Sequence, residues 1–226
     1  MSRINIIGLG GIGSALIPPL SRWLSGTPAK DIVLVDGDKF SRGNSNRQNM
    51  SELDIGEFKV VVHARCIHSA FRQLNVMPIN QYISGENASD IIINGDTIFL
   101  CVDNHATRKL VSERCQRLDN ITLISGGNEL TDGSVQIYLR RNGRNRTPAI
   151  ERYHPEIANP KDKNPADLSC EELARMPGSE QVIFTNFTAA CIMLNAFYSL
   201  VSRDKTLGYT EVYFDIITNK ALPRKR

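Results

Sequence analysis

Four side chains in the first half of the chain could together handle a phosphate ester and a metal ion: Asn44, Arg47, Lys59 and Asp103. Arg47 and Lys59 could neutralise phosphate oxygens, and Asn44 could hydrogen-bond them without adding charge. Asp103 could hold Mg²⁺, which prefers one carboxylate together with phosphates and waters. Such a set suits attack of a carboxylate on the α-phosphate of ATP, which needs fixed positive charge and geometry but no general base.

Each of these residues also has an ordinary structural explanation. Asp103 could cap the helix that follows it, Arg47 could form a surface ion pair, and Asn44 could shape a turn. Each explanation is sufficient for one residue alone. The four residues in one chain, in this order, favour a shared site.

The segment Ile4 to Gln48 predicts how the site is positioned. A buried strand, Ile4 to Ile7, runs into Gly8-Leu9-Gly10-Gly11-Ile12-Gly13, and helical spacing follows from Ser14 to Leu24. A second buried strand, Ile32 to Val35, ends on Asp36. Strand, G-x-G-x-x-G, helix, strand and acid form the nucleotide-binding βαβ fingerprint.

Each element of that fingerprint has a physical task. Gly8 allows a tight turn, Gly10 allows the backbone to approach a phosphate, and Gly13 allows the helix to pack close to the sheet. The carboxylate of Asp36 can accept hydrogen bonds from both ribose hydroxyls. The fingerprint predicts nucleotide binding, but it does not choose between a dinucleotide and ATP.

The rest of the chain predicts strands that alternate with helices. A polar loop over residues 37–49 follows Asp36, at the carboxyl ends of the strands, where ligands of open α/β sheets bind. We then expect a helix at 58–74 that begins near Lys59, a strand at 76–83, a short helix or strand at 88–94, a strand at 97–102, a helix at 106–118, a strand at 122–125, a turn at 126–128 and a strand at 133–140.

The last third of the chain changes in composition. Five prolines between residues 147 and 182 predict a long irregular crossover segment, with one helical turn at 170–176. A helix at 184–200 and a strand at 211–217 follow, and we expect the basic end, 223–226, to be a frayed tail. The predicted fold is α/β and Rossmann-like, with a doubly wound, mostly parallel sheet and helices on both faces, in a single domain over residues 1–226.

Composition restricts the classes of function. The chain has 226 residues, 41% of them hydrophobic, and its net charge of +3 is too small and dispersed to predict specific nucleic-acid binding. The basic run 140–146 reads first as a solvated turn and second as a patch for an anionic partner. There is no run of 18 apolar residues and no room for a signal peptide, so we expect a cytoplasmic protein without membrane contact. Without a C-x-x-C among its five cysteines, we expect reduced thiols and no zinc.

Five ordered motifs resemble the E1-like activating family, the ThiF and MoeB superfamily. That family combines a G-x-G-G-x-G turn, D-x-D, S-N-x-x-R-Q, a lysine about a dozen residues further on, and a strand that ends in D-N. The corresponding residues here are Gly8 to Gly13, Asp36-Gly37-Asp38, Gly43-Asn44-Ser45-Asn46-Arg47-Gln48, Lys59, and Asp103-Asn104 with Arg108 shortly after. The similarity covers about the first 110 residues and continues more weakly at Ser125 to Asn128 and in the late helix.

The resemblance implies an ATP-dependent adenylyltransferase. Such an enzyme activates the C-terminal carboxylate of a ubiquitin-like or sulfur-carrier protein that ends in Gly-Gly, with ATP and Mg²⁺ as cofactors. It implies that Gln48 orients the Arg47 loop and that Arg47, Lys59 and Asp103 are catalytic, with Asp103 on the metal. Arg108 is expected to be structural, because five residues after Asp103 it should lie one turn into the following helix. The implied nucleotide-binding set is Gly8, Gly10, Gly11, Gly13, Asp36, Asp38, Asn44, Arg47, Gln48, Lys59, Asp103 and Asn104.

The sequence departs from the family pattern in places. It lacks the paired C-x-x-C of many members and an N-terminal helix with the arginine that reaches the partner's ATP. A chain of 226 residues leaves no room for a second adenylation half, so a minimal homodimer is expected. Cys170, in the crossover segment, is the candidate for a nucleophile that would take over the acyl group, against the alternative of an exposed loop thiol.

Other functions remain open at this point. An NAD-dependent oxidoreductase would share the glycine fingerprint but would not need Asn44, Arg47, Lys59 and Asp103 together. A noncatalytic nucleotide-binding subunit of an E1-like pair would not need to retain all four of these residues either. Activation of a small-molecule or tRNA carboxylate would use the same residues.

Overall fold

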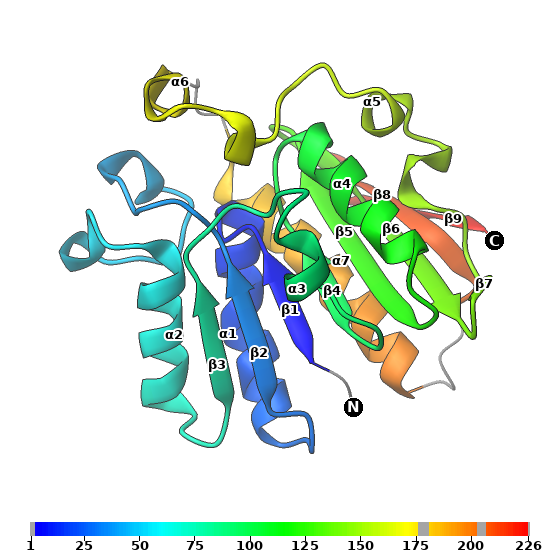
Figure 1. Ribbon diagram of the computed structural model, residues 1–226, viewed down its shortest axis with the longest axis horizontal. Helices are drawn as coiled ribbons and strands as arrows, with labels where there is room; N and C mark the ends of the chain where they lie inside the picture. The colour runs from blue at the N-terminus through cyan, green and yellow to red at the C-terminus, as the bar shows by residue number, and fades with distance from the viewer. Residues whose placement is uncertain (1–2, 176–180, 203–206, 226) are drawn as a thin grey trace.

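A computed structural model describes residues 3–175, 181–202 and 207–225, without the side chains of residues 170, 174 and 175. Within those residues, nine strands form one sheet in the order β3-β2-β1-β4-β5-β6-β8-β9, with β7 paired to β6. Helices lie on both faces of this sheet (Figure 1). The predicted α/β fold is confirmed.

The first five strands in this order run parallel, as the βαβ pattern predicts. They are β3 (Asn75–Ile79), β2 (Asp31–Val35), β1 (Ile4–Ile7), β4 (Thr97–Leu100) and β5 (Ile121–Asn128). β1 and β4 are wholly or almost wholly apolar and buried, because helices cover both faces of a parallel sheet. Pro78 lies in β3 at the edge of the sheet, where a residue without an N–H is tolerated because one side of the strand has no neighbouring strand to bond.

The other half of the sheet is antiparallel. β6 (Asp132–Arg141) returns beside β5, and β8 (Tyr209–Asp215) and β9 (Lys220–Lys225) follow as a hairpin, with the short β7 (Arg144–Asn145) on β6. Two predictions were wrong here. The expected turn at 126–128 continues β5, because its backbone pairs with Ser134 and its neighbours on β6. The expected frayed tail belongs to β9 up to residue 225, since residues 223–225 pair with β8; residue 226 lies outside the described residues.

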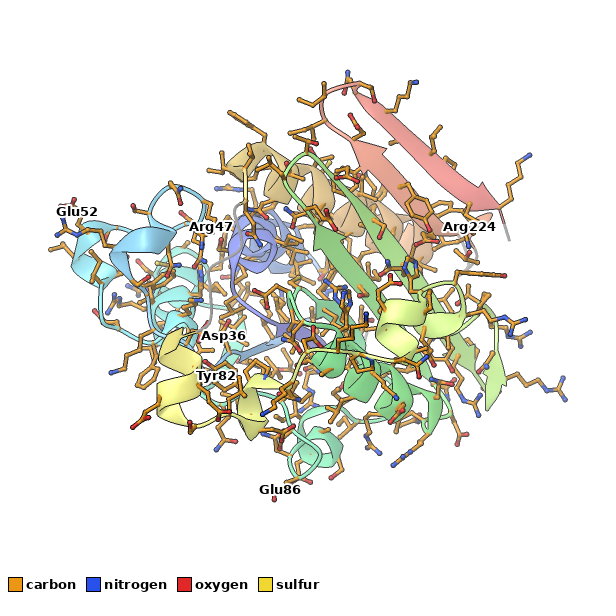
Figure 2. All side chains as sticks on the ribbon, turned by 90° about the horizontal axis from the view of Figure 1, so that it is seen from above. Asp36, Arg47, Glu52, Tyr82, Glu86 and Arg224 are labelled. Atoms are coloured by element: carbon orange, nitrogen blue, oxygen red, sulfur yellow. The ribbon has the colours of Figure 1, made fainter. Side chains whose placement is uncertain are left out.

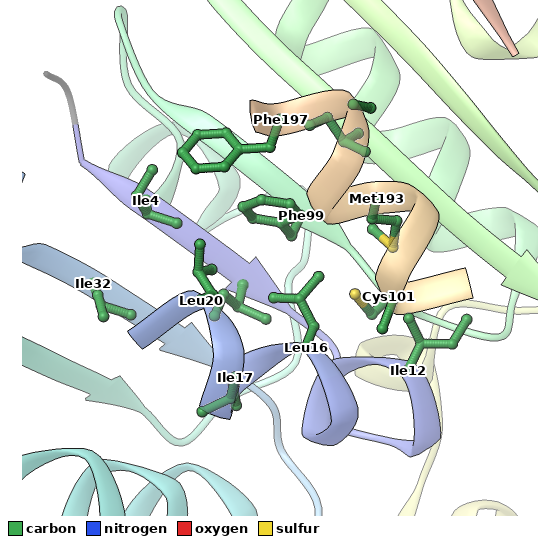
Figure 3. Packing of buried hydrophobic residues seen from close by; sticks show 14 of the residues in the cluster. Ile4, Ile12, Leu16, Ile17, Leu20, Ile32, Phe99, Cys101, Met193 and Phe197 are labelled. Atoms are coloured by element: carbon green, nitrogen blue, oxygen red, sulfur yellow. The ribbon is translucent and has the colours of Figure 1, made fainter. Parts of the chain in front are cut away.

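The helices form two layers, each with its own apolar core. α1 (Gly11–Ser25), α2 (Lys59–Ala70) and α7 (Ile183–Ser202) cover one face; α3 (Ala88–Ile91), α4 (His105–Gln116) and α5 (Pro155–Ala158) cover the other. In Figure 3, Leu16 and Leu20 of α1 meet Phe99 of β4 and Met193 and Phe197 of α7. Burial of each such side chain contributes about 1.5–3 kcal/mol.

The helices differ from prediction mainly at their ends. α1 begins three residues earlier than expected and tolerates Pro18 and Pro19 inside it, and α2 ends at Ala70, four residues early. Within the described residues, one helix, α7, is long and apolar enough to cross a membrane by length and composition. In the structure its inner face packs on α1 and the sheet.

The described part of the crossover segment, 147–175 with 181–182, is more regular than predicted. It contains η3 (Ile150–Arg152), α5, η4 (Pro165–Asp167) and α6 (Cys170–Arg175), so the helical turn expected near Cys170 is present and three other short helices were missed. Two further single turns, η1 (Arg42–Asn44) and η2 (Glu52–Asp54), shape the polar loop after β2. The crossover lies at the edge toward which β2 and β3 point (Figure 1).

Candidate active site

A cavity of about 650 Å³ opens at the carboxyl edge of the parallel strands. Its wall is formed by the glycine turn after β1, the loop after β2, the start of α4, the β5–β6 hairpin and the crossover segment. This is where open α/β sheets bind ligands. Figure 2 looks onto this edge and shows Asp36, Arg47 and Tyr82 near one another, with Arg224 on the far side.

The glycine turn is packed too tightly for any other residue at two of its positions. Gly8 has φ +87°, and a Cβ there would lie 2.9 Å from the backbone of Cys101. A Cβ on Gly13 would lie 2.1 Å from the carbonyl oxygen of Gly8, so Gly13 brings α1 against the sheet, behind the cavity wall. Gly10 and Gly11 line the cavity, and no protein atom lies within 4 Å of a Cβ built on Gly10. The free side of Gly10 and the start of α1 leave room for an anion.

Asp36 lies at the end of β2, buried on the cavity wall. Its carboxylate accepts hydrogen bonds from the backbone N–H of Leu9 (2.6 Å) and of Asp38 (2.7 Å), which ties the glycine turn to the loop after β2. Burial raises the pKa of Asp36, and the cation of Lys59 opposes that rise. Lys59 therefore helps to keep this carboxylate ionised and able to accept hydroxyl groups.

Lys59 and Asp38 form an ion pair on the same wall. The Nζ atom of Lys59 lies 2.9 Å from Oδ2 of Asp38; the lysine side chain is 6% exposed and the aspartate side chain 47%. Tyr82, which sequence reasoning missed, donates its hydroxyl to the other oxygen of Asp38 and packs its ring against Gly37. A signal for Tyr82 existed: it follows β3 at the edge where the other site residues follow their strands.

The polar loop contributes Asn44 and Arg47 to the wall. The side-chain oxygen of Asn44 accepts hydrogen bonds from the N–H (2.9 Å) and hydroxyl (3.2 Å) of Ser41, so Asn44 shapes the turn, as its structural explanation predicts. Arg47 donates to the carbonyl of Gly43 and to Asn46. Gln48 is buried and does not reach the cavity; its N–H bonds to Asn44 (2.9 Å), which fits a role in shaping the loop.

Asp103 and Asn104 follow β4 and lie on the cavity wall. Asn104 caps α4, because its side-chain oxygen accepts from the N–H of Thr107 at 2.8 Å. Asp103 is exposed, so its carboxylate is available. Arg108 is buried and donates to Ser125 (2.7 Å) and to the carbonyls of Val102 and Gly126, as expected of a structural residue.

The residues fit ATP with Mg²⁺, although no group of three or more His, Cys, Asp or Glu side chains that could hold a metal lies within the described ranges. A phosphate-bound Mg²⁺ needs only one or two carboxylates, with phosphates and waters as its other ligands. Asp103 supplies one carboxylate on the cavity wall. The cations Arg47 and Lys59 and the open side of Gly10 supply the surroundings for the phosphates.

The far end of the cavity holds a polar cluster that sequence reasoning missed. His154, in the crossover, contacts Glu211 of β8 through Nε2 and Glu156 through Nδ1 (2.7 Å). Arg224 of β9 lies 3.5 Å from Glu211 and stacks 4.5 Å from the ring centre of Tyr153. The members come from segments far apart in the chain, so no local pattern could reveal them. The cluster fastens the crossover to the last two strands.

We expect the His154 cluster to stabilise the fold in a pH-dependent way. The bond with Glu211, which outweighs the effect of burial, raises the pKa of His154 above its ordinary value of 6.5. The contribution is therefore complete below about pH 6.5 and is lost as the pH rises through the higher pKa of the folded state. The difference in unfolding free energy between wild type and His154→Gln, from denaturant titrations, should shrink between pH 6 and pH 9. A difference that grows over this range would show that His154 is neutral when folded.

The side chain of Cys170 lies outside the described residues, although α6 begins at this residue, as expected. Of the other cysteines, Cys66 and Cys191 are exposed and Cys101 and Cys115 are buried. Cys101 touches the cavity, but burial raises the pKa of its thiol to about 12. A thiol of that pKa is not a nucleophile at neutral pH.

Fold and site together define a Rossmann-like α/β protein with a cavity at the carboxyl edge of its parallel strands, and comparison with known proteins specifies its family. Residues 1–222 match the ThiF family, so the chain belongs to that family. It is 26% identical over 143 residues to the molybdopterin-synthase adenylyltransferase of Escherichia coli, covering 63% of this chain and 55% of that protein. It is 29% identical over 143 residues to the adenylyltransferase and sulfurtransferase MOCS3 of Drosophila ananassae, covering 63% of this chain and 31% of that protein.

Solved structures confirm the fold. The crystal structure of E. coli MccB with ATP superposes with a TM-score of 0.73 at 18% identity, over 99% of this chain and 63% of that chain. The chain spans about a third to just over half of the length of the curated relatives it matches. The named relatives are adenylyltransferases, which confirms the resemblance to E1-like enzymes.

Proposed function

We propose that this protein is an ATP-dependent adenylyltransferase that activates the C-terminal carboxylate of a ubiquitin-like or sulfur-carrier protein as an acyl-adenylate. The observation that carries the proposal is the grouping of Arg47, Lys59 and Asp103 on one cavity wall with the open side of Gly10. An enzyme that transferred a hydride would need the glycine turn but not this set of charges. The adenylyltransferase names of the relatives support the same reaction.

Each residue then has a defined task. Asp36 accepts the ribose hydroxyls, the N-terminus of α1 and Asn44 hold phosphate oxygens, and Arg47 and Lys59 balance the charge that develops as the carboxylate oxygen bonds to the α-phosphorus. Mg²⁺, when bound through Asp103, would supply further charge to the pyrophosphate that leaves. The carboxylate is already ionised at neutral pH, so no proton is transferred.

Calorimetry with both nucleotides tests the choice of ligand. We expect heat of binding for ATP with Mg²⁺ and none for NAD, because the loop after Asp36 adds Asn44 and Arg47 to the cavity wall, and a dinucleotide site does not need them. Asp36→Ala should weaken ATP binding, whereas the matched change Asp31→Ala, at the exposed start of the same strand, should not. Tight binding of NAD without a response to ATP would overturn the assignment.

Two other functions stay as alternatives on the same site. A small-molecule or tRNA carboxylate could be the acceptor of the adenylyl group, and structures of MccB in complex with MccA show a related fold with that molecule bound. A noncatalytic subunit would bind ATP without exchanging pyrophosphate. The full set of charged residues on the wall favours the catalytic proposal.

A homodimer is also proposed, and an exposed stripe on α7 supports it. Phe184, Phe187, Tyr198 and Val201 are 66%, 51%, 58% and 38% exposed, and with Cys191 and Leu194 they follow an alternating spacing of three and four residues. Residues at that spacing lie along one face of a helix and form an apolar seam. Two copies of the chain can pack these seams against each other about a two-fold axis.

Sedimentation velocity tests the dimer. Wild type should sediment at twice the chain mass of 25.2 kDa, and Phe187→Glu with Tyr198→Glu should sediment as a monomer because two charges cannot be buried in an apolar seam. Leu53→Glu, which adds charge at a residue 89% exposed on η2, is the control and should leave the mass unchanged. A wild-type monomer would contradict the proposal.

A further proposal, which stands on the sequence, is that Cys170 receives the activated acyl group. With a carrier protein supplied, Cys170→Ala should retain adenylation while a thiol-sensitive covalent conjugate disappears. Cys66→Ala, which removes another exposed thiol, is the control and should retain the conjugate. Persistence of the conjugate in Cys170→Ala would remove Cys170 from the mechanism.

A further inference from the structure

Tyr82 is connected to the cation of Lys59 through one carboxylate. Its hydroxyl donates to Oδ1 of Asp38, and Nζ of Lys59 lies 2.9 Å from Oδ2 of the same group. Tyr82 and Lys59 both line the cavity, and Figure 2 shows Tyr82 near Asp36, at the nucleotide end. One side chain of the loop after β2 is thus shared between a phenol and an ammonium group.

The phenol of Tyr82 is held in a fixed place. Its ring lies against Gly37, where a Cβ would come within 2.8 Å of two ring atoms. The carbonyl of Tyr82 accepts a hydrogen bond from Nδ2 of Asn87 at 3.0 Å. The next carbonyl, of Ile83, accepts one from Nδ2 of the buried Asn164 at 2.9 Å. These two amides belong to the start of α3 and to the crossover, so two separate parts of the fold fix the position of the hydroxyl.

Asp38, by contrast, has a side chain with few restraints. The side chain is 47% exposed, and among the described residues its carboxylate has hydrogen-bond and ion-pair partners only in Tyr82 and Lys59. Its backbone is fixed, because its N–H donates to Asp36 (2.7 Å) and its carbonyl accepts from the N–H of Lys59 (3.0 Å). Without the hydroxyl of Tyr82, the carboxylate would be free to rotate about its side-chain bonds and turn both oxygens toward Lys59.

The orientation of Asp38 decides what Lys59 can reach. An ammonium group has three N–H donors, and within the described part of the chain Asp38 is the only side chain that accepts one from Lys59. Two donors remain for phosphate oxygens in the cavity. A carboxylate that turned both oxygens toward Nζ would occupy a second donor and draw the ammonium group away from the phosphates. Because Tyr82 already binds Oδ1, only Oδ2 is left for Lys59.

We propose that Tyr82 is a positioning residue for adenylation, which holds Asp38 by one oxygen and so keeps Nζ of Lys59 directed at the phosphates. The inference rests on the proposed function and adds a residue that acts through Asp38 rather than on the substrate. Its effect belongs to the transition state, because the alignment of a fixed charge matters most where new charge develops. A displacement of about 1 Å in such a site lowers a rate by up to about 100-fold.

Tyr82→Phe tests the inference, since it removes the hydroxyl and keeps the ring on Gly37. In pyrophosphate exchange with a small β-grasp protein that ends in Gly-Gly, we expect kcat to fall about tenfold. The Kd for ATP, from calorimetry, should stay within about twofold of wild type, because the charge of Lys59 remains in the site. Tyr138→Phe is the matched control. It removes a hydroxyl that donates to Asn145 at 2.8 Å outside the cavity, and it should keep the wild-type kcat.

A double-mutant cycle with Asp38→Ala tests the path of the effect. Without the carboxylate the hydroxyl has nothing to hold, so adding Tyr82→Phe to Asp38→Ala should change kcat by less than about twofold. The same loss in both backgrounds, an unchanged kcat in Tyr82→Phe, or weaker ATP binding at unchanged kcat would overturn the inference and leave adenylation standing. If Asp38→Ala itself exchanged no pyrophosphate, the comparison of kcat with Kd in Tyr82→Phe would decide alone. Absence of exchange by the wild type would instead refute the proposed function, and this inference with it.

Discussion

Replacing Lys59 with alanine should strongly reduce acyl-adenylate formation and also destabilise the protein. The loss of one fixed positive charge at the phosphates is expected to raise the barrier by about 2.7–4 kcal/mol, a fall in exchange rate of about 100- to 1000-fold. Unlike a purely ligand-facing residue, Lys59 is also buried and paired with Asp38, and it opposes the raised pKa of the buried Asp36.

The destabilisation should be moderate. Removal of one partner from a fully buried ion pair costs about 3–5 kcal/mol, but Asp38 is half exposed, so water replaces part of the interaction and we expect about 1–3 kcal/mol. Lys59→Met separates the two roles, since it keeps the packed stem and removes the charge. Exposed Lys39, which lies over the ring of Phe58 outside the cavity, gives the control Lys39→Ala. Wild-type exchange by Lys59→Met would refute the role of the charge.

Arg47→Ala and Asp103→Asn should reduce exchange as strongly, with little change in melting temperature. Both side chains lie on the cavity wall, and Asp103 is exposed, so neither change opens the core. Asp103→Asn should in addition raise the Mg²⁺ concentration required for half-maximal exchange, because an amide is a weaker ligand than a carboxylate.

Arg42 supplies the control for Arg47. It is an exposed arginine of the same loop that does not reach the cavity, so Arg42→Ala should leave exchange near the wild-type rate. Thermal melting and initial exchange rates, measured on the same preparations, distinguish a site effect from unfolding. If Arg47→Ala or Asp103→Asn exchanged pyrophosphate at the wild-type rate, the proposed role of that residue would be wrong.

The nucleotide end of the site could be predicted because its signals are local. Gly8, Gly13 and Asp36 lie in one βαβ unit, where the positive φ of Gly8 and the 2.1 Å approach behind Gly13 leave glycine as the only residue that fits. Lys59 begins α2 and Asp103 follows β4, and these two element ends meet at one edge of the sheet. Strand order then brings residues distant in sequence onto one wall.

The other end could not be predicted, because it depends on long-range packing. His154 is in a proline-rich segment without periodicity, and Glu211 and Arg224 come from strands that pair antiparallel with a sheet whose first half is parallel. The basic residues of 223–225 looked like a tail, yet in β9 Arg224 pairs with Glu211 across the hairpin. Tyr82 is intermediate between the predictable and the unpredictable residues, because its position after a strand end was a usable signal.

Carrier-dependent exchange of labelled pyrophosphate into ATP tests the central claim most directly. A small β-grasp protein that ends in Gly-Gly is supplied with a free C-terminal carboxylate or with the same terminus amidated. We predict Mg²⁺-dependent exchange with the free carboxylate and none with the amide, because only the carboxylate can attack the α-phosphate. Binding of ATP without exchange for any carboxylate donor, or exchange that does not distinguish the acid from the amide, would contradict the account.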